Sequence, residues 1–116
     1  MPKKATGAAD LLASVEHAAR AAVSAAGPHL VTRRRWGHDW RAGTDLVCLV
    51  GRFSSHVGVE FWRGSSLAPD HPMLEGTGKN LRHVKLRTVA EARSAEFASL
   101  VRAAVELDGR SEPRRR

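Results

Sequence analysis

Apolar residues recur at helical spacing in the first quarter of the chain. Over residues 8–26 they follow one another at intervals of three and four, with polar side chains between them. That spacing predicts an amphipathic helix. Gly27 and Pro28 should end it, because glycine accepts the left-handed capping conformation and proline cannot extend the hydrogen-bond ladder. The apolar positions are Leu11, Val15, Ala19, Ala22 and Ala26.

A second helical pattern occupies the last quarter. Thr88 and Glu91 have the spacing of a capping box, in which each side chain caps the backbone of the other. An apolar stripe follows, and the helix is expected to end near Asp108 and Gly109. The stripe consists of Phe97, Leu100, Val101, Ala104 and Leu107.

Between the helices, the apolar pattern changes to that of strands. Residues 30–36 fit a short strand, residues 37–44 are expected to form a loop, and residues 46–53 form a β-rich apolar run typical of a central strand. After a turn at residues 54–55, apolar and polar residues alternate over 56–62, as expected when one face is buried. A hairpin is therefore predicted.

The last strand is expected over residues 81–87, with Val84 and Leu86 facing inward. The longest loop, residues 63–79, precedes it and is rich in glycine and proline. The order helix, strands, helix predicts an α+β two-layer sandwich: an antiparallel sheet of about four to five strands, flanked on one face by an N-terminal and a C-terminal helix. The other face is left to solvent or to a partner.

The net charge of +7 is concentrated at the two ends. Residues 1–7 and 109–116 hold six of the 19 basic residues and one of the 12 acidic residues, so five units of the net charge lie there. Neither segment has a periodic apolar pattern, so both are predicted to be disordered tails around one domain over residues 8–108. Through these tails, nonspecific contact with nucleic acid is expected.

Nothing in the chain indicates export or membrane insertion. The longest apolar run, residues 46–50, is far too short to span a bilayer, and the N-terminal segment carries charges that a secretory signal would exclude. The single cysteine, Cys48, lies in an apolar strand and is expected to be a small buried hydrophobe. A cytoplasmic protein without membrane contact is predicted.

The middle of the chain contains several short sequence motifs in a distinctive order. Trp36-Gly37 is followed by the segment 56–61, then by the segments 74–79 and 82–86. This order, over about residues 29–107, resembles the YdhG-like domain-of-unknown-function family of small bacterial proteins. The resemblance implies a two-layer sandwich with an antiparallel sheet, and one branch of the family is frataxin-like and described as intracellular iron chaperones. Asp39 and Arg34 depart from the family pattern, which carries proline and an aliphatic residue there.

The glycine-rich loop is the first candidate binding site. The segment consists of Gly76, Thr77, Gly78 and Lys79. Its glycines could allow successive backbone N–H groups to point at one anion, and its lysine could add a positive charge. It is not a nucleotide P-loop, because that motif needs a glycine where Met73 stands and a Ser or Thr after the lysine. The alternative is that the glycines only turn the chain into the neighbouring strand.

The outward positions of the sheet are the second candidate. Basic groups around an aromatic side chain suit an anionic ligand or an acidic protein surface, although a solvated sheet face is often basic as well. The candidate residues are His56, Trp62, His83 and Lys85, with Arg87 beyond them.

Metal binding and catalysis have weaker support in the sequence. None of the six histidines pairs at metal-site spacing, and only a composite of His38-Asp39, Asp70-His71 and His83 could gather ligands. No catalytic residue and no metal ligand is assigned, and iron enters only through the family analogy. The leading hypothesis is a non-enzymatic module that binds an anionic ligand or an acidic partner. A frataxin-like iron chaperone and a small metal-dependent enzyme remain as alternatives, and the ligand, partner and oligomeric state stay open.

Overall fold

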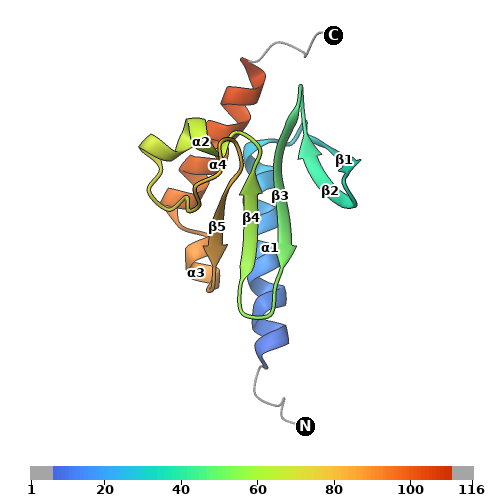
Figure 1. Ribbon diagram of the computed structural model, residues 1–116. Coiled ribbons are helices and arrows are strands. Elements are labelled where there is room, and N and C mark those ends of the chain that lie inside the picture. Colours follow the sequence, from blue (N-terminus) through green and yellow to red (C-terminus); the bar gives the residue numbers. More distant parts are fainter. Residues whose placement is uncertain (1–6, 111–116) are drawn as a thin grey trace.

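The computed structural model describes residues 7–110 and has the predicted α+β fold. Its strands form one five-stranded antiparallel sheet in the order β1-β2-β3-β4-β5, so each strand pairs with its neighbour in sequence. Figure 1 shows α1 (Ala8–Ala26) running behind β3 and β4, and no helix within residues 7–110 covers the opposite face of the sheet. The strands are β1 (Val31–Arg35), β2 (His38–Ala42), β3 (Leu46–Arg52), β4 (Val57–Phe61) and β5 (Arg82–Leu86).

The two long helices, residues 8–26 and 95–109, come before and after the strands in the sequence, and two short helical turns, residues 64–67 and 68–70, lie between β4 and β5. The first matches its predicted bounds, and Gly27 caps it through an N–H bond to the Val23 carbonyl at 2.9 Å. The second ends at Gly109, as expected. The elements are α1 (Ala8–Ala26), α2 (Gly64–Leu67), η1 (Ala68–Asp70), α3 (Val89–Ala92) and α4 (Ala95–Gly109). Residues 1–6 and 111–116, which make up most of the predicted tails, lie outside the described residues. None of the helices within 7–110 is both long and apolar enough to cross a membrane.

The main core lies between α1, α4 and the sheet. Phe61, Leu86, Phe97 and Leu100 are fully buried in it. Alternation along β4 and β5 brings the apolar side chains to the helical face, where each large one contributes about 1.5–3 kcal/mol. Cys48 belongs to this core, and burial raises the pKa of its thiol to about 12. It is therefore an unreactive buried hydrophobe, as predicted.

Residues 37–44 do not form the predicted loop, because His38–Ala42 is strand β2. Trp36 and Gly37 form a two-residue turn between β1 and β2, and both have positive φ, 53° and 77°. Type I′ hairpin turns require positive φ at both central residues. Trp40 and Ala42 alternate with polar residues and are buried. Strand β2 was not predicted because most of its residues are polar and only these two side chains are buried.

The C-terminal helical region is two helices rather than the single predicted one. The predicted capping box is present: the Glu91 backbone N–H donates to Thr88 Oγ1 at 3.0 Å, and the Thr88 N–H donates to Glu91 Oε1 at 3.2 Å. It caps only the four-residue helix α3. Ser94 then caps α4, with its Oγ accepting from the Phe97 N–H at 3.1 Å. Two N-capping residues close together start two helices.

A buried carboxylate joins the end of α4 to the turn between β2 and β3. Asp108 is only 4% exposed. Its two oxygens accept from the backbone N–H groups of Thr44 and Asp45, each at 2.8 Å. A side chain on Gly43 would collide with this carboxylate, so glycine is required where the turn approaches α4. From the sequence, Asp108 is recognisable only as a residue at the end of the helix.

Candidate functional site

The strand register defines the side chains of the open sheet face. One cross-strand row consists of Leu49, Glu60 and His83, and the next consists of Gly51, Gly58 and Lys85. Because alternate residues of a strand share a face, these rows lie opposite Val50, Val59 and Val84, which belong to the core. His56 and Trp62 continue the β4 row at its two ends. The four predicted sheet residues, His56, Trp62, His83 and Lys85, therefore share one face.

Three tryptophans gather at one end of this face. Trp36, at the turn of the β1–β2 hairpin, stacks on Trp62 with ring centroids 5.7 Å apart and planes 25° apart. Trp40 meets Trp62 edge-on at 5.8 Å. The Arg35 guanidinium lies 5.0 Å from the centroid of the Trp36 ring, within the range of a cation–π contact. We call Arg35, Trp36, Trp40 and Trp62 the tryptophan cluster.

The tryptophan cluster has two features that oppose folding. Trp36 has a φ of 53°, in the left-handed region that costs a residue with a side chain about 1–2 kcal/mol. Its side chain is nevertheless 65% exposed, so little burial offsets that cost. Trp40 is buried, yet its indole N–H has no hydrogen-bond partner among the described residues. Departures from folding rules that gather in one place are typical of functional sites.

A second aromatic cluster lies at the other end of β3 and β4. The rings of Phe53 and His56 stack with centroids 4.9 Å apart and planes 21° apart, and Phe53 is 54% exposed. The Phe53 ring covers Gly58, since a Cβ on that glycine would lie 2.7 Å from Phe53 Cε2. Partial removal from water, together with the positive charges of Lys85 and Arg87, lowers the pKa of His56 below its ordinary value.

The segment of the open face between the two aromatic clusters carries side chains. Gly58 lies under the Phe53 ring, and a Cβ on Gly51, its partner across β3 and β4, would have nothing within 4 Å. The row of Leu49, Glu60 and His83 comes next toward the tryptophan cluster. Gly58 and Trp62, which directly follows β4, are four residues apart, about 13 Å at the rise of a β-strand. The open face thus has an exposed aromatic group at each end.

Glu75 reduces the positive charge at the β5 side of this face. It pairs with His83 through two backbone hydrogen bonds of 2.7 and 3.1 Å. Its Oε1 lies 3.6 Å from His83 Nε2 and 4.0 Å from Lys85 Nζ. A carboxylate therefore stands beside two of the predicted anion-binding residues, and the tryptophan cluster with Arg35 is the better place for an anion.

The predicted glycine-rich loop begins next to the open face. Gly76 has a φ of 109°, and a Cβ there would lie 3.5 Å from the His83 ring. The Gly78 carbonyl accepts from Arg82 Nε at 2.8 Å, while a Cβ on Gly78 would lie 2.7 Å from the Leu81 carbonyl oxygen. Thr77 and Lys79 are exposed. Both glycines are needed to turn the chain into β5, and an anion-binding role for Lys79 stays a prediction.

These contacts predict different results for three alanine variants of the loop. Gly76→Ala and Gly78→Ala should each lower the free energy of unfolding by about 1 kcal/mol or more, the first through its positive φ and the second through the Leu81 carbonyl. Lys79→Ala should leave it within about 0.5 kcal/mol, as is usual for a surface side chain. Denaturant unfolding of the three variants tests this, and a Lys79→Ala protein that unfolds as early as the glycine variants would contradict it.

The residues considered for metal binding are not brought together. Within residues 7–110, no three His, Cys, Asp or Glu side chains form a group that could hold a metal ion. Asp39 is paired with Arg34 at 2.8 Å on the β1–β2 hairpin. Asp70 and His71 instead line a cavity beside the start of α4. The composite site of loop histidines is therefore not assembled.

The sequence pattern predicted two of the five aromatic side chains in the two clusters. It predicted Trp62 and His56, but it placed Trp36 at the end of a strand and Trp40 in a loop, and it gave Phe53 no role. The pair Trp36-Gly37 between two polar alternating runs was the signal for a hairpin turn. Recognising that turn would have brought Trp40 onto the face of the sheet.

Comparisons of this chain with protein-family models, with curated proteins and with solved structures found no match.

Proposed function

We propose that this chain is a binding module whose open sheet face takes an anionic ligand that carries flat rings, namely the unpaired nucleotides of a single-stranded nucleic acid. The main support is the tryptophan cluster, in which a strained and exposed Trp36 stacks on Trp62 beneath a guanidinium group. A sheet that presents aromatic side chains for stacking is an established means of binding unpaired bases.

The two aromatic clusters suit a strand rather than a single nucleotide. Bases stack on aromatic rings with a gain of about 1–3 kcal/mol each, whatever their sequence. Trp36 and Trp62 provide one stacking position, and Phe53 with His56 provides another at the far end of the open face. A short run of nucleotides would cross the row of Leu49, Glu60 and His83 between them.

Charge supports the same ligand. Arg35 stands over Trp36, so a base that stacks there can take the place of the guanidinium, which is then free to contact a phosphate. The net charge of +7 favours the approach of a polyanion. The sequence predicts contact with nucleic acid only through the basic tails, and this proposal differs in assigning it to the open sheet face. An acidic protein partner would use the charge but leave the exposed stack without a role.

Intrinsic fluorescence tests the proposal directly, because the chain has three tryptophans and no tyrosine, and all three tryptophans belong to the tryptophan cluster. Titration with an oligothymidylate of about eight nucleotides should quench the emission in a saturable way. The controls are a duplex of equal length and an acidic polypeptide at matched ionic strength. Equal quenching by the acidic polypeptide would favour a protein partner, and no quenching by the oligonucleotide would refute the proposal.

Neighbouring arginines on opposite faces of β1 provide a matched pair of charge variants. Arg35→Gln should weaken oligonucleotide binding by about tenfold and make the slope of log K against log salt shallower by about 0.7, the value for one lost phosphate contact on a single strand. Arg34→Gln removes the same charge from the other face, where Arg34 pairs with Asp39, and should leave the slope unchanged. Equal losses of oligonucleotide affinity in both variants would mean that only the overall charge of the protein attracts the oligonucleotide.

A further inference from the structure

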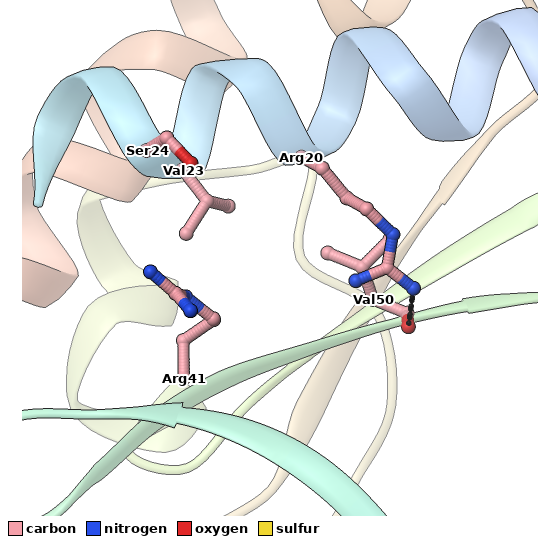
Figure 2. Close-up of a pocket in the computed structure, with 5 residues that line it drawn as sticks. All are labelled: Arg20, Val23, Ser24, Arg41 and Val50. Atoms are coloured by element: carbon pink, nitrogen blue, oxygen red, sulfur yellow. Dashed lines mark hydrogen bonds between the residues drawn. The ribbon is translucent and has the colours of Figure 1, made fainter. Parts of the chain in front are cut away.

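The helical side of the sheet contains a cavity of about 140 Å³ between α1, β2 and β3. Figure 2 shows Arg20 reaching from α1 and Arg41 reaching from β2 into the space between them, with Ser24 above. Val23 and Val50 complete its lining. Because a water molecule occupies about 30 Å³ of liquid, this volume suits a group of about five non-hydrogen atoms.

The two guanidinium groups retain unused donors. Arg41 donates to the Leu30 carbonyl at 2.9 Å and to Thr32 Oγ1 at 3.2 Å, which are both neutral acceptors. Arg20 donates to the Val50 carbonyl at 3.1 Å. In Figure 2, another terminal nitrogen of Arg20 points away from that carbonyl into the space. Each guanidinium is thus held in place, Arg20 by Glu16 and the Val50 carbonyl and Arg41 by Leu30 and Thr32, and each has more N–H donors than these contacts use.

The local charge is positive even with the nearest acid included. Glu16 Oε2 pairs with Arg20 through Nε at 2.9 Å and Nη2 at 2.8 Å, but Oε1 of the same carboxylate accepts from Arg52 at 2.8 and 3.0 Å. The hydrogen bond from Arg52 is the main reason that the pKa of Glu16 lies below its ordinary value. Since Arg52 shares this carboxylate, Glu16 leaves part of the Arg20 charge and all of the Arg41 charge uncompensated.

We propose that this cavity binds a small tetrahedral oxyanion, inorganic phosphate or the phosphoryl group of a small phosphomonoester, between the Arg20 and Arg41 guanidinium groups and the Ser24 hydroxyl. Paired arginines recognise such groups through parallel N–H bonds that also fix orientation. The cavity lies on the opposite side of the sheet from the tryptophan cluster, so this site is independent of the proposed nucleotide-binding face.

A carboxylate introduced at the cavity should replace the oxyanion. Ser24→Glu places it against the two arginines, whereas Ala25→Glu adds the same charge one residue away, at an exposed position that does not line the cavity. Both changes stand in the last turn of α1 and carry a similar unfavourable interaction with the helix dipole. The Ser24→Glu protein should therefore melt at a higher temperature than the Ala25→Glu protein in phosphate-free buffer.

Thermal melting and isothermal titration with inorganic phosphate, against chloride of equal ionic strength, test the site. Phosphate should bind the parent and Ala25→Glu with one-to-one stoichiometry and bind Ser24→Glu about tenfold or more weakly. Glycerol phosphate in a parallel titration distinguishes the free ion from a phosphomonoester. If Ser24→Glu does not fold, Ser24→Leu fills the cavity instead. Trp36→Asn should bind phosphate normally, which separates this site from the nucleotide-binding face. Equal phosphate binding by the Ser24 and Ala25 variants, or none by the parent, would overturn the proposal.

Discussion

Asp108→Ala is expected to lower the free energy of unfolding by about 3 kcal/mol, a large part of the stability of a domain this small. The carboxylate is buried and accepts from the backbone N–H groups of Thr44 and Asp45. Alanine would leave both N–H groups without these acceptors and open a cavity between α4 and the β2–β3 turn. Hydrogen bonds to a charged group are worth about 1.5–3 kcal/mol each.

Two further variants show whether the loss comes from these hydrogen bonds. Asp108→Asn should lie between the parent and Asp108→Ala, because an amide has one acceptor oxygen and its NH₂ group would face the other backbone donor. Glu106→Ala removes an exposed acid from the same turn of α4 and should change the stability by less than about 0.5 kcal/mol. Urea unfolding of the three proteins measures this. Similar losses for Asp108→Ala and Glu106→Ala would show that the buried carboxylate does not tie α4 to the sheet.

Trp36→Asn is expected to separate binding from stability. Asparagine tolerates the left-handed conformation and is favoured before glycine in a type I′ turn, so the hairpin should form readily. The gain of about 1–2 kcal/mol from relieved strain offsets the loss of about 0.5–1.5 kcal/mol from the stack on Trp62. The stability should therefore stay within about 1 kcal/mol of the parent, while oligonucleotide binding weakens by about 10- to 100-fold.

The matched control for Trp36→Asn is Leu11→Asn, which removes an exposed apolar side chain from α1. It should bind the oligonucleotide like the parent. Trp36→Phe keeps a ring in the stack and should retain much of the affinity. Fluorescence anisotropy of a labelled oligonucleotide gives the affinities and thermal melting gives the stabilities. If Trp36→Asn binds the oligonucleotide normally but melts well below the parent, the stack of Trp36 on Trp62 stabilises the fold and is not a binding surface.

The fold was largely predictable because its main elements bury an apolar face with clear periodicity. Helix α1 and strands β3, β4 and β5 each carry a continuous apolar pattern, and the predicted bounds were close to those observed. Strand β2 was missed because it buries only Trp40 and Ala42 between polar residues. The break between α3 and α4 was missed because the stripe continues on both sides of Ser94, so the apolar pattern alone does not show it.

The candidate site was only partly predictable for a related reason. Period-2 alternation identified the outward positions His56, Trp62, His83 and Lys85. The stack of Trp36 on Trp62 depends on how the β1–β2 hairpin lies relative to β4, and that is a long-range feature. The neutralising position of Glu75 depends on its backbone pairing with His83 in the same way. The resemblance to YdhG-like proteins, the iron-chaperone alternative and the cytoplasmic location stay predictions from the sequence.

Amide and indole NMR mapping tests the central claim most directly. The ¹⁵N-labelled protein would be titrated with oligothymidylate at moderate salt, and shifts would be followed residue by residue. We predict that the indole signals of Trp36 and Trp62 and the amides of Leu49, Gly51 and Gly58 move together and saturate, while the amides of α1 and α4 stay in place. Shifts confined to the helices or to the chain ends, with the three indole signals unchanged, would contradict the proposal that the open sheet face binds single-stranded nucleic acid.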